Sequence, residues 1–335
     1  MRRFLNNVKK MKNSDIFSIK NETDFEKICL DTFLYQAKHC KPYCKWVNLL
    51  DINVKNIDKI EKIPFIPIEL FKTEKIYCCD EKEQIVFSSS STTGVNQSFH
   101  YVADLDLYEK SFINAFHLFY GEPKKYAILG LLPSYLERSG SSLVYMVDNL
   151  IKQTENPRSG FFLHNHNELF NTLCALCKEK IPAILIGVTY ALLDFVEKYS
   201  IDFQELIVME TGGMKGKREE ISREKLHEIL CRRFGVQQIH SEYGMTELLS
   251  QAYSKGQGKF LCPPWMKIII RDIYNPFKFL PVDTAGGINI IDLANRNSCS
   301  FIATQDLGKT HTDGTFEILG RLNASDMRGC NLLVQ

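Results

Sequence analysis

The most informative segment of the sequence is HSEYGMTELLSQ, which occupies residues 240–251. It follows a short apolar run that we predict to be a β-strand, and it brings together Tyr243, Gly244, Thr246 and Glu247. A carboxylate beside a hydroxyl at the end of a strand is suited to hold Mg²⁺ and a phosphate group. The same residues could also begin an ordinary helix, so the rest of the chain has to decide between the two interpretations.

A second polar stretch, FSSSSTTG at residues 87–94, holds four serines and two threonines before Gly94. It comes after a predicted strand over Gln84–Phe87 and ahead of a helical pattern over 107–119. A loop of this kind can turn backbone N–H groups and hydroxyls toward one point, as the binding of phosphate oxygens requires. It does not match the phosphate loop that ends in lysine, because no lysine follows Gly94. A polar surface loop is the alternative interpretation.

Apolar runs alternate with segments of helical spacing along the middle of the chain. This alternation favours α/β units around a largely parallel sheet. From about Pro263 the runs become short and are separated by Asn, Asp, Gly and Pro, which predicts a mostly β part. The predicted strands are 125–132, 182–188, 205–210, 236–240, 267–274, 286–293 and 299–304, and the predicted helices are 23–39, 166–179 and 222–235.

Local signals predict where some of these elements begin and end. Thr23 and Glu26 have the spacing of a capping box at the start of the first helix, and Gly235 stops the last helix. Pro64 and Pro67 lie in apolar surroundings, where they favour an extended connector over a helix.

The composition narrows the classes of function. The chain has 335 residues, 44% of them hydrophobic, which is enough to bury a large core. Its 41 basic and 40 acidic residues give a net charge of +1, so we expect no nucleic-acid partner and an anionic ligand held by local contacts. The basic start is not followed by an apolar segment, and no run of about 18 apolar residues occurs. We therefore expect a cytoplasmic protein without a membrane span.

Eleven cysteines, an odd number without regular spacing, predict thiols that are reduced and mostly buried. Two groupings could suggest zinc, namely Cys174 with Cys177, and His39 with Cys40 and Cys44. Each grouping lacks a second pair at zinc spacing, so we expect no zinc site.

The combination of the two polar stretches is more specific than either one. A Ser/Thr/Gly loop followed by Tyr-Gly-Met-Thr-Glu resembles the adenylate-forming superfamily of acyl-CoA and aryl-CoA ligases, peptide-synthetase adenylation domains and luciferases. ATQDLG at 303–308 resembles the segment whose aspartate binds the ribose, and GRLNASDMRGCN at 320–331 resembles the Gly-Arg hinge. The resemblance implies the α/β fold of the large domain of these enzymes, with layered sheets and a smaller β-rich subdomain near the C-terminus.

Within that superfamily the chain resembles the LuxE-type acyl-protein synthetases. The matching phrases are IPFIPIELFK (63–72), LPSYLERSGSSLVYMV (132–147), ETGGMKGKREEI (210–221), HSEYGMTELLSQAY (240–253) and RGCNLL (328–333). The resemblance implies an adenylate-forming domain over 1–319, with a helical and extended part (1–80), an α/β core (81–262) and a β-rich subdomain (263–319). It also implies a hinge-like segment over 320–335 that carries Cys330, and the absence of the small C-terminal domain of other adenylate-forming enzymes.

The implied activity is an ATP-dependent, AMP-forming ligase reaction that uses Mg²⁺. A fatty acid is activated to an acyl-adenylate, and the acyl group passes as a thioester to Cys330 and then to a partner such as an acyl-CoA-reductase-like protein or an acyl carrier. The implied binding residues for ATP are Ser89, Ser90, Thr92, Thr93 and Gly94 at the phosphates, Gly212, Gly213, Tyr243 and Gly244 near adenine, Thr246 at the α-phosphate, Glu247 at Mg²⁺, and Asp306 with Arg321 at the ribose.

Cys330 has an alternative interpretation, because CNLLV is largely apolar and could be a final β-strand with a buried cysteine. As a nucleophile it would suit the chemistry, since a thiolate attacks a mixed anhydride readily, and Arg328 could lower its pKa. Lys215 is a candidate cation for the phosphates. His240 is interpreted as a core or wall residue, with a role in the acyl or phosphate site as the alternative. Ser139–Ser142 could line the substrate or cap the next helix.

The sequence departs from the family pattern on the phosphate side. Ser91 stands where glycine is common, Val95–Gln97 offer no lysine after the loop, and Ser325–Met327 replace the hinge lysine. Gln305 replaces the glycine before Asp306 but leaves the aspartate in place. We therefore expect a weaker or differently arranged phosphate site. Two other functions stay open: a ligase that passes another carboxylic acid to CoA or a carrier protein, and a catalytically weak binding protein.

Overall fold

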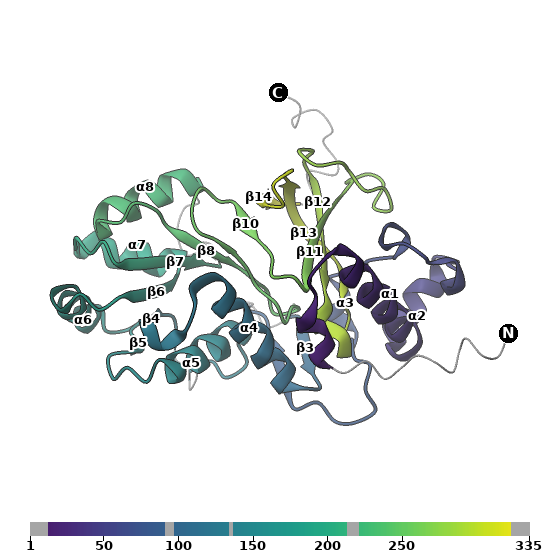
Figure 1. Ribbon diagram of the computed structural model, residues 1–335, viewed down its shortest axis with the longest axis horizontal. Helices are drawn as coiled ribbons and strands as arrows, with labels where there is room; N and C mark the ends of the chain where they lie inside the picture. The colour runs from purple at the N-terminus through teal and green to yellow at the C-terminus, as the bar shows by residue number, and fades with distance from the viewer. Residues whose placement is uncertain (1–12, 91–96, 134–136, 213–220, 323–335) are drawn as a thin grey trace.

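The computed structural model describes residues 13–90, 97–133, 137–212 and 221–322. Within these residues a single sheet of twelve strands runs through the molecule, and a separate hairpin contains two more strands. One half of the large sheet is parallel and the other half is antiparallel. Figure 1 shows these two halves side by side, with most of the helices around the parallel half.

The parallel half consists of β5 (Gly160–Phe161), β4 (Ala127–Leu131), β6 (Ala183–Val188), β7 (Leu206–Thr211) and β8 (His240–Tyr243), in that spatial order. The helices around it are α4 (Leu105–Tyr120), α5 (Ser142–Thr154), α6 (His166–Glu179), α7 (Thr189–Lys198) and α8 (Arg223–Phe234). Figure 1 shows α4 and α5 on one face of the sheet and α7 and α8 on the other. The two helical layers explain why β4 and β6 are buried along their whole length, and they confirm the α/β alternation predicted from the sequence.

The antiparallel half continues the same sheet beyond β8. Its strands are β9 (Ala252–Ser254), β10 (Phe260–Leu261), β14 (Phe316–Arg321), β13 (Phe301–Thr310), β12 (Gly286–Asp292) and β11 (Met266–Arg271), in spatial order. The prediction of a β-rich part after Pro263 is confirmed by β11 to β14. The division of the chain into parts at residues 80, 262 and 319 stays a prediction.

The N-terminal segment packs on the antiparallel half although it lies far from it in sequence (Figure 1). Its elements are η1 (Asn13–Ser18), α1 (Glu22–His39), α2 (Lys41–Leu49), η2 (Val54–Asn56), η3 (Ile60–Lys62), β1 (Ile66–Pro67) and α3 (Leu70–Thr73). The buried Gln36 amide on α1 donates to the backbone carbonyls of Asn295 and Arg296, each at 2.9 Å. These two residues belong to η5 (Leu293–Asn297), whereas the remaining short helix, η4 (Pro123–Lys125), precedes β4.

Several of the predicted element ends are wrong; the strand predicted over 299–304, for example, continues to Thr310 as β13. The first helix is capped by Asn21, whose side chain accepts a hydrogen bond from the backbone N–H of Asp24, and not by Thr23. The strand predicted over 236–240 begins at His240, where we expected it to end, and continues to Tyr243. Its polar side chains can be buried because the Ser241 hydroxyl donates to Glu210 on β7 at 2.7 Å and the Thr211 hydroxyl donates to Glu242.

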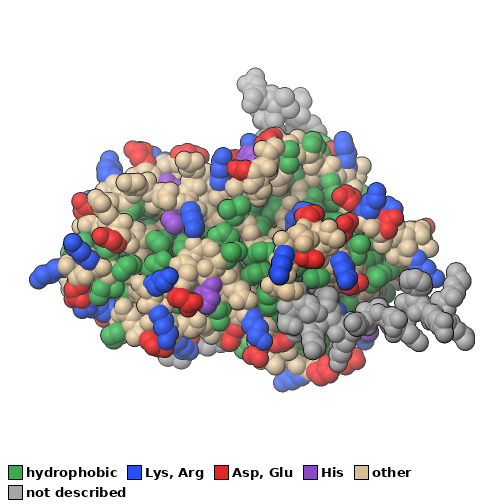
Figure 2. Space-filling view, viewed as in Figure 1, with side chains coloured by type: hydrophobic (Ala, Val, Ile, Leu, Met, Phe, Trp, Pro, Cys, Tyr) green, Lys and Arg blue, Asp and Glu red, His purple; other side chains and the backbone are tan. Residues whose placement is uncertain are grey.

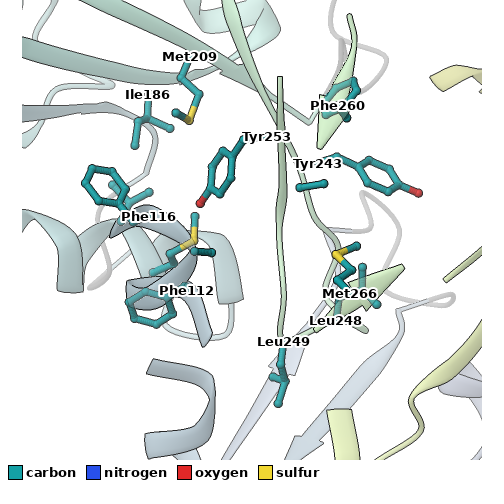
Figure 3. Close-up of a cluster of buried hydrophobic side chains, with 14 of the residues drawn as sticks. Phe112, Phe116, Ile186, Met209, Tyr243, Leu248, Leu249, Tyr253, Phe260 and Met266 are labelled. Atoms are coloured by element: carbon teal, nitrogen blue, oxygen red, sulfur yellow. The ribbon is translucent and has the colours of Figure 1, made fainter. Parts of the chain in front are cut away.

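The core on the parallel side is filled with aromatic and sulfur-containing side chains. Figure 3 shows Phe112, Phe116, Ile186 and Met209 gathered near Tyr253, whereas the side chain of Tyr243 points away from this group. Phe112 and Phe116 are almost completely buried in this packing. On the face seen in Figure 2 the acidic and basic side chains are interspersed, as a net charge of +1 leads one to expect. Among the described residues, no helix combines the length and the apolar composition needed to cross a membrane.

Candidate active site

Three residues from three separate motifs meet where the two halves of the sheet join. The Tyr243 hydroxyl donates to Oδ2 of Asp306 at 2.8 Å, and Nε of Arg321 donates to Oδ1 of the same carboxylate at 3.2 Å. Asp306 and Arg321 are directly opposite each other in the register of β13 and β14. The carboxylate is therefore held by one donor on each oxygen, and its position is fixed before any ligand binds.

The ring of Tyr243 is held by two phenylalanines. Its centroid lies 6.1 Å from that of Phe260 and 5.8 Å from that of Phe316, both in edge-to-face arrangements. Burial raises the pKa of Tyr243 well above its usual value, and the negative charge of Asp306 adds to this effect. The phenol therefore stays protonated and remains a hydrogen-bond donor to Asp306.

Two hydrogen bonds between Ser89 and Ser98 close the base of the Ser/Thr loop. The loop connects β2 (Ile85–Ser88) and β3 (Phe99–Val102). The backbone N–H of Ser89 donates to the Ser98 carbonyl at 3.0 Å, and the backbone N–H of Ser98 donates to the Ser89 hydroxyl at 2.9 Å. Ser90 follows as an exposed residue, while Ser91, Thr92, Thr93 and Gly94 lie outside the described residues.

Ser98 also connects this loop to the Tyr243–Glu247 motif, because its side chain lies near enough to the Glu247 carboxylate to lower the pKa of that group. Glu247 is only 6% exposed. Burial raises the pKa of Glu247, whereas the Ser98 side chain and the charges of Arg321 and Lys72 act in the opposite direction. A buried carboxylate that its surroundings compensate only in part would be stabilised by a cation, so Glu247 fits the role predicted for it at Mg²⁺.

No group of three or more His, Cys, Asp or Glu side chains is arranged to hold a metal within the part of the chain that the structure describes. A single carboxylate is nevertheless compatible with Mg²⁺ in a nucleotide site, because this ion usually takes one or two protein carboxylates together with phosphate oxygens and water.

The turn that carries Thr246 and Glu247 is supported by residues that sequence reasoning missed. Nδ1 of His100 on β3 donates to the Thr246 carbonyl at 2.8 Å, and Nδ2 of Asn295 donates to the Glu247 carbonyl at 2.6 Å. Asp292 accepts from the backbone N–H groups of Leu249 and Ser250 at 2.8 and 3.0 Å. The polar Asp292 at the end of an apolar run could have signalled such a role, whereas no local pattern marks His100.

His100 is neutral at physiological pH. Burial lowers its pKa to about 4, and the bond to the Thr246 carbonyl only partly offsets this effect. Since the carbonyl can only accept, the proton of the neutral ring must lie on Nδ1, which leaves Nε2 with a lone pair. Nε2 is buried and has no hydrogen-bond partner among the described residues.

The glycines of the predicted site lie at two neighbouring strand ends. Gly212 directly follows β7 and has a φ of 73°, which a side chain would disfavour, while Gly213 and Lys215 lie outside the described residues. A Cβ atom on Gly244 would collide with the Glu242 carboxylate. The strands that end at these glycines, β7 and β8, are neighbours and run parallel, and the Thr211 hydroxyl donates to Glu242 between them. Both turns therefore lie at the carboxyl ends of adjacent parallel strands, where α/β folds bind ligands.

The remaining predicted residues have the following places. Ser141 caps α5, its hydroxyl accepting from the backbone N–H of Val144 at 3.4 Å, so the capping alternative for this serine cluster is confirmed. His240 hydrogen-bonds to the Tyr120 hydroxyl at 3.2 Å, and burial lowers its pKa to about 4, as expected of a core residue. Cys330 lies outside the described residues.

Comparisons with known proteins bear on the fold and on part of the sequence. No family model matches the chain. Over 71 residues, or 21% of the chain, the sequence is 32% identical to a long-chain-fatty-acid–luciferin-component ligase from Photorhabdus luminescens. The match covers 60% of the length of that relative.

Solved structures of two ligases share the fold. A 2-hydroxyisobutyryl-CoA ligase, crystallised with 2-HIB-AMP and CoA, superposes with a TM-score of 0.70 at 13% identity, over 91% of this chain and 70% of the ligase. ATP-bound MatB from Rhodopseudomonas palustris gives a TM-score of 0.53 at 16% identity, over 70% of this chain and 47% of MatB. The resemblance inferred from the sequence is thus confirmed: the chain has the fold of the adenylate-forming ligases and is similar, over part of its length, to a LuxE-type ligase.

Proposed function

We propose that this protein is an ATP-dependent acyl-protein synthetase that activates a fatty acid and transfers the acyl group to Cys330. The observation that carries the proposal is the contact of Tyr243 and Arg321 with Asp306, since these residues come from three motifs that the sequence assigned to one nucleotide site. The partial similarity to a fatty-acid ligase supports the choice of substrate.

In the first step the fatty carboxylate attacks the α-phosphorus of ATP. A new bond forms between a carboxylate oxygen and phosphorus, the bond from the α-phosphorus to the bridging oxygen breaks, and pyrophosphate leaves. Both reactants are anions, so the protein has to bring them together and compensate their charge. Asp306 accepts hydrogen bonds from the ribose hydroxyls and thereby fixes the nucleotide, while Tyr243 and Arg321 fix Asp306.

The phosphates lie between the Ser/Thr loop and the Thr246–Glu247 turn. Ser89, Ser90 and the following loop residues bind the β- and γ-phosphates, and the Thr246 hydroxyl binds the α-phosphate. Glu247 is the protein ligand for Mg²⁺, which when bound neutralises part of the phosphate charge. His100 and Asn295 keep the turn in place through their bonds to its carbonyls.

In the second step the Cys330 thiolate attacks the carbonyl carbon of the acyl-adenylate. A carbon–sulfur bond forms, the bond between the acyl carbon and the phosphate oxygen breaks, and AMP leaves with the electron pair. The thiol proton goes to solvent when the thiolate forms. The thioester then delivers the acyl group to a partner, for which an acyl-CoA-reductase-like protein or an acyl carrier is suited.

A second function is a ligase that transfers the activated acid to CoA or to a carrier protein. The observation that favours it is the likeness of the fold to a ligase crystallised with CoA. The two functions share the first step and differ in the acceptor.

The test is the intact mass of the protein after incubation with Mg²⁺-ATP and a mixture of fatty acids, with and without hydroxylamine. We expect an added acyl mass that hydroxylamine removes, absent from Cys330→Ser and present in the matched control Cys174→Ser, because Cys174 is an exposed thiol remote from these motifs in sequence. If pyrophosphate is released but neither the wild type nor Cys174→Ser is acylated, CoA or a carrier is favoured as acceptor. No pyrophosphate release at all would contradict both functions.

A further inference from the structure

The phosphate side of the proposed site needs a cation that the usual motifs do not supply. The positions after the Ser/Thr loop are Val95, Asn96 and Gln97, and the hinge-like segment has Ser325, Asp326 and Met327. The departure of pyrophosphate concentrates negative charge, which phosphoryl-transfer enzymes stabilise with Lys, Arg or metal ions. A basic residue from another part of the chain would supply this charge alongside Mg²⁺.

The short helix α3 enters the site from the N-terminal segment. The strand before it, β1, pairs in parallel with β13, and the backbone N–H of Ile68 donates to the Ala303 carbonyl at 3.0 Å. Glu69, at the start of α3, accepts a hydrogen bond from the side chain of Gln305, the residue before Asp306. One end of α3 is thus fixed next to the ribose carboxylate.

The middle of α3 lies against the turn that carries Thr246. Phe71 is 1% exposed, and its ring meets the ring of His100 edge-on at a centroid distance of 5.9 Å. His100 in turn donates to the Thr246 carbonyl. The next residue on the helix, Lys72, is exposed, and the helix that carries it lies between Gln305 on the ribose side and His100 on the phosphate side.

Lys72 differs from two nearby lysines in its ion pairing. Within the described ranges, no carboxylate lies at ion-pair distance from its ammonium group, in contrast to Lys62, which pairs with Asp58 at 2.7 Å, and Lys75, which pairs with Glu83 at 2.8 Å.

We propose that Lys72 is the residue that binds the β- and γ-phosphates of ATP and stabilises the departing pyrophosphate. This inference rests on the proposed function and extends it, because it places the missing cation in the N-terminal segment. A compact ammonium group on a flexible stem can follow the phosphates as the bond to the leaving group breaks. Lys215 is the rival candidate.

The test compares Lys72→Ala, Lys72→Arg, Lys215→Ala and the control Lys62→Ala in two assays. The first is fatty-acid-dependent exchange of pyrophosphate into ATP, and the second is binding of ATP and of AMP. For Lys72→Ala we expect exchange to fall about 100-fold, as when one charge-stabilising group is removed from an active site, and the ATP affinity to fall with it. The AMP affinity should stay within about twofold, because AMP has neither the β- nor the γ-phosphate that Lys72 binds.

Lys72→Arg should recover part of the exchange rate, since it retains the charge, and Lys62→Ala should behave as wild type. Unchanged exchange in Lys72→Ala would overturn the assignment, and a loss confined to Lys215→Ala would assign the role to Lys215. An equal loss of ATP and AMP affinity together with a lower Tm would show a structural role instead. If wild type itself neither exchanges pyrophosphate nor binds ATP, the proposed function fails, and the assignment of Lys72 fails with it.

Discussion

The two ends of the candidate site differ in how completely their polar groups are satisfied. At the nucleoside end, each oxygen of Asp306 has a donor, from Tyr243 on one side and Arg321 on the other. At the phosphate end, burial raises the pKa of Glu247, and Nε2 of His100 is buried without a hydrogen-bond partner among the described residues. The Asp306 carboxylate is thus held in place by the protein and keeps lone pairs for the ribose hydroxyls, whereas the second end has polar groups without a protein partner. The nucleoside end should therefore govern the affinity for AMP, and the phosphate end should govern the rate of activation.

The largest effect is expected at Glu247. Glu247→Gln should lower fatty-acid-dependent pyrophosphate exchange by about 100- to 1000-fold, because it removes the carboxylate proposed to hold Mg²⁺ where the leaving group departs. AMP binding should be almost unchanged, and the exposed Glu61→Gln should serve as the control with normal exchange. A loss of AMP affinity as large as the loss of rate would show that the two ends do not act separately.

A smaller effect, on nucleotide affinity rather than on rate, is expected at Asp306. Asp306→Asn should raise the Kd of both ATP and AMP about 30-fold, since a hydrogen bond to a charged group contributes about 2 kcal/mol. Isothermal titration with the two nucleotides measures this directly. A rise in the Kd of ATP without a rise in the Kd of AMP would mean that Asp306 binds the phosphates, which contradicts its assignment to the ribose.

Tyr243→Phe should lower nucleotide affinity less than Asp306→Asn does. The substitution removes one hydrogen bond of about 1 kcal/mol from Asp306 while keeping the ring between Phe260 and Phe316, so we expect about a fivefold loss of AMP affinity with Arg321 still in contact. An unchanged AMP affinity would mean that Arg321 alone is sufficient to hold the carboxylate.

The smallest effect concerns stability rather than activity. Burial lowers the pKa of His100 and of His240 to about 4, below the value of about 6.5 expected in the unfolded chain. The unfolded chain therefore binds more protons between these values, and the free energy of unfolding should fall as the pH is lowered from about 6.5 to 4. Burial raises the pKa of Asp292 to about 6, so this carboxyl acts in the opposite direction, lowering stability as the pH rises from about 4 to 6.

Because these contributions partly cancel, the net change should be about 3 kcal/mol, measurable from urea unfolding across that pH range. His100→Asn, which offers a donor to the Thr246 carbonyl and does not titrate, should flatten the pH profile, and Asp292→Asn should steepen it. A profile unaffected by His100→Asn would mean that His100 is not held neutral in the folded protein.

Much of the fold could be predicted because it depends on local pattern. The fully apolar run over Ala183–Val188 and the glycine after Phe234 have one natural interpretation each, and both elements form as expected. The HSEY strand could not be located from its own residues, because its polar side chains are buried only through partners on β7 such as Glu210 and Thr211. Pairing of this kind is invisible to periodicity.

The same distinction applies to the site. Tyr243, Asp306 and Arg321 could be named from motifs, and the structure brings them into contact. His100 and Lys72 could not be named, because they reach the site through the pairing of β1 with β13 and the contact of α3 with β3, both between segments far apart in sequence. Side chains that support a site from another element therefore required the structure.

Exchange of labelled pyrophosphate into ATP by the wild-type protein, with and without fatty acid, tests whether this protein activates a carboxylic acid as an adenylate. We predict exchange that requires both Mg²⁺ and a fatty acid and that persists in Cys330→Ser, because activation precedes transfer to the thiol. Formation of ADP and phosphate, or no exchange with any carboxylic acid, would contradict it.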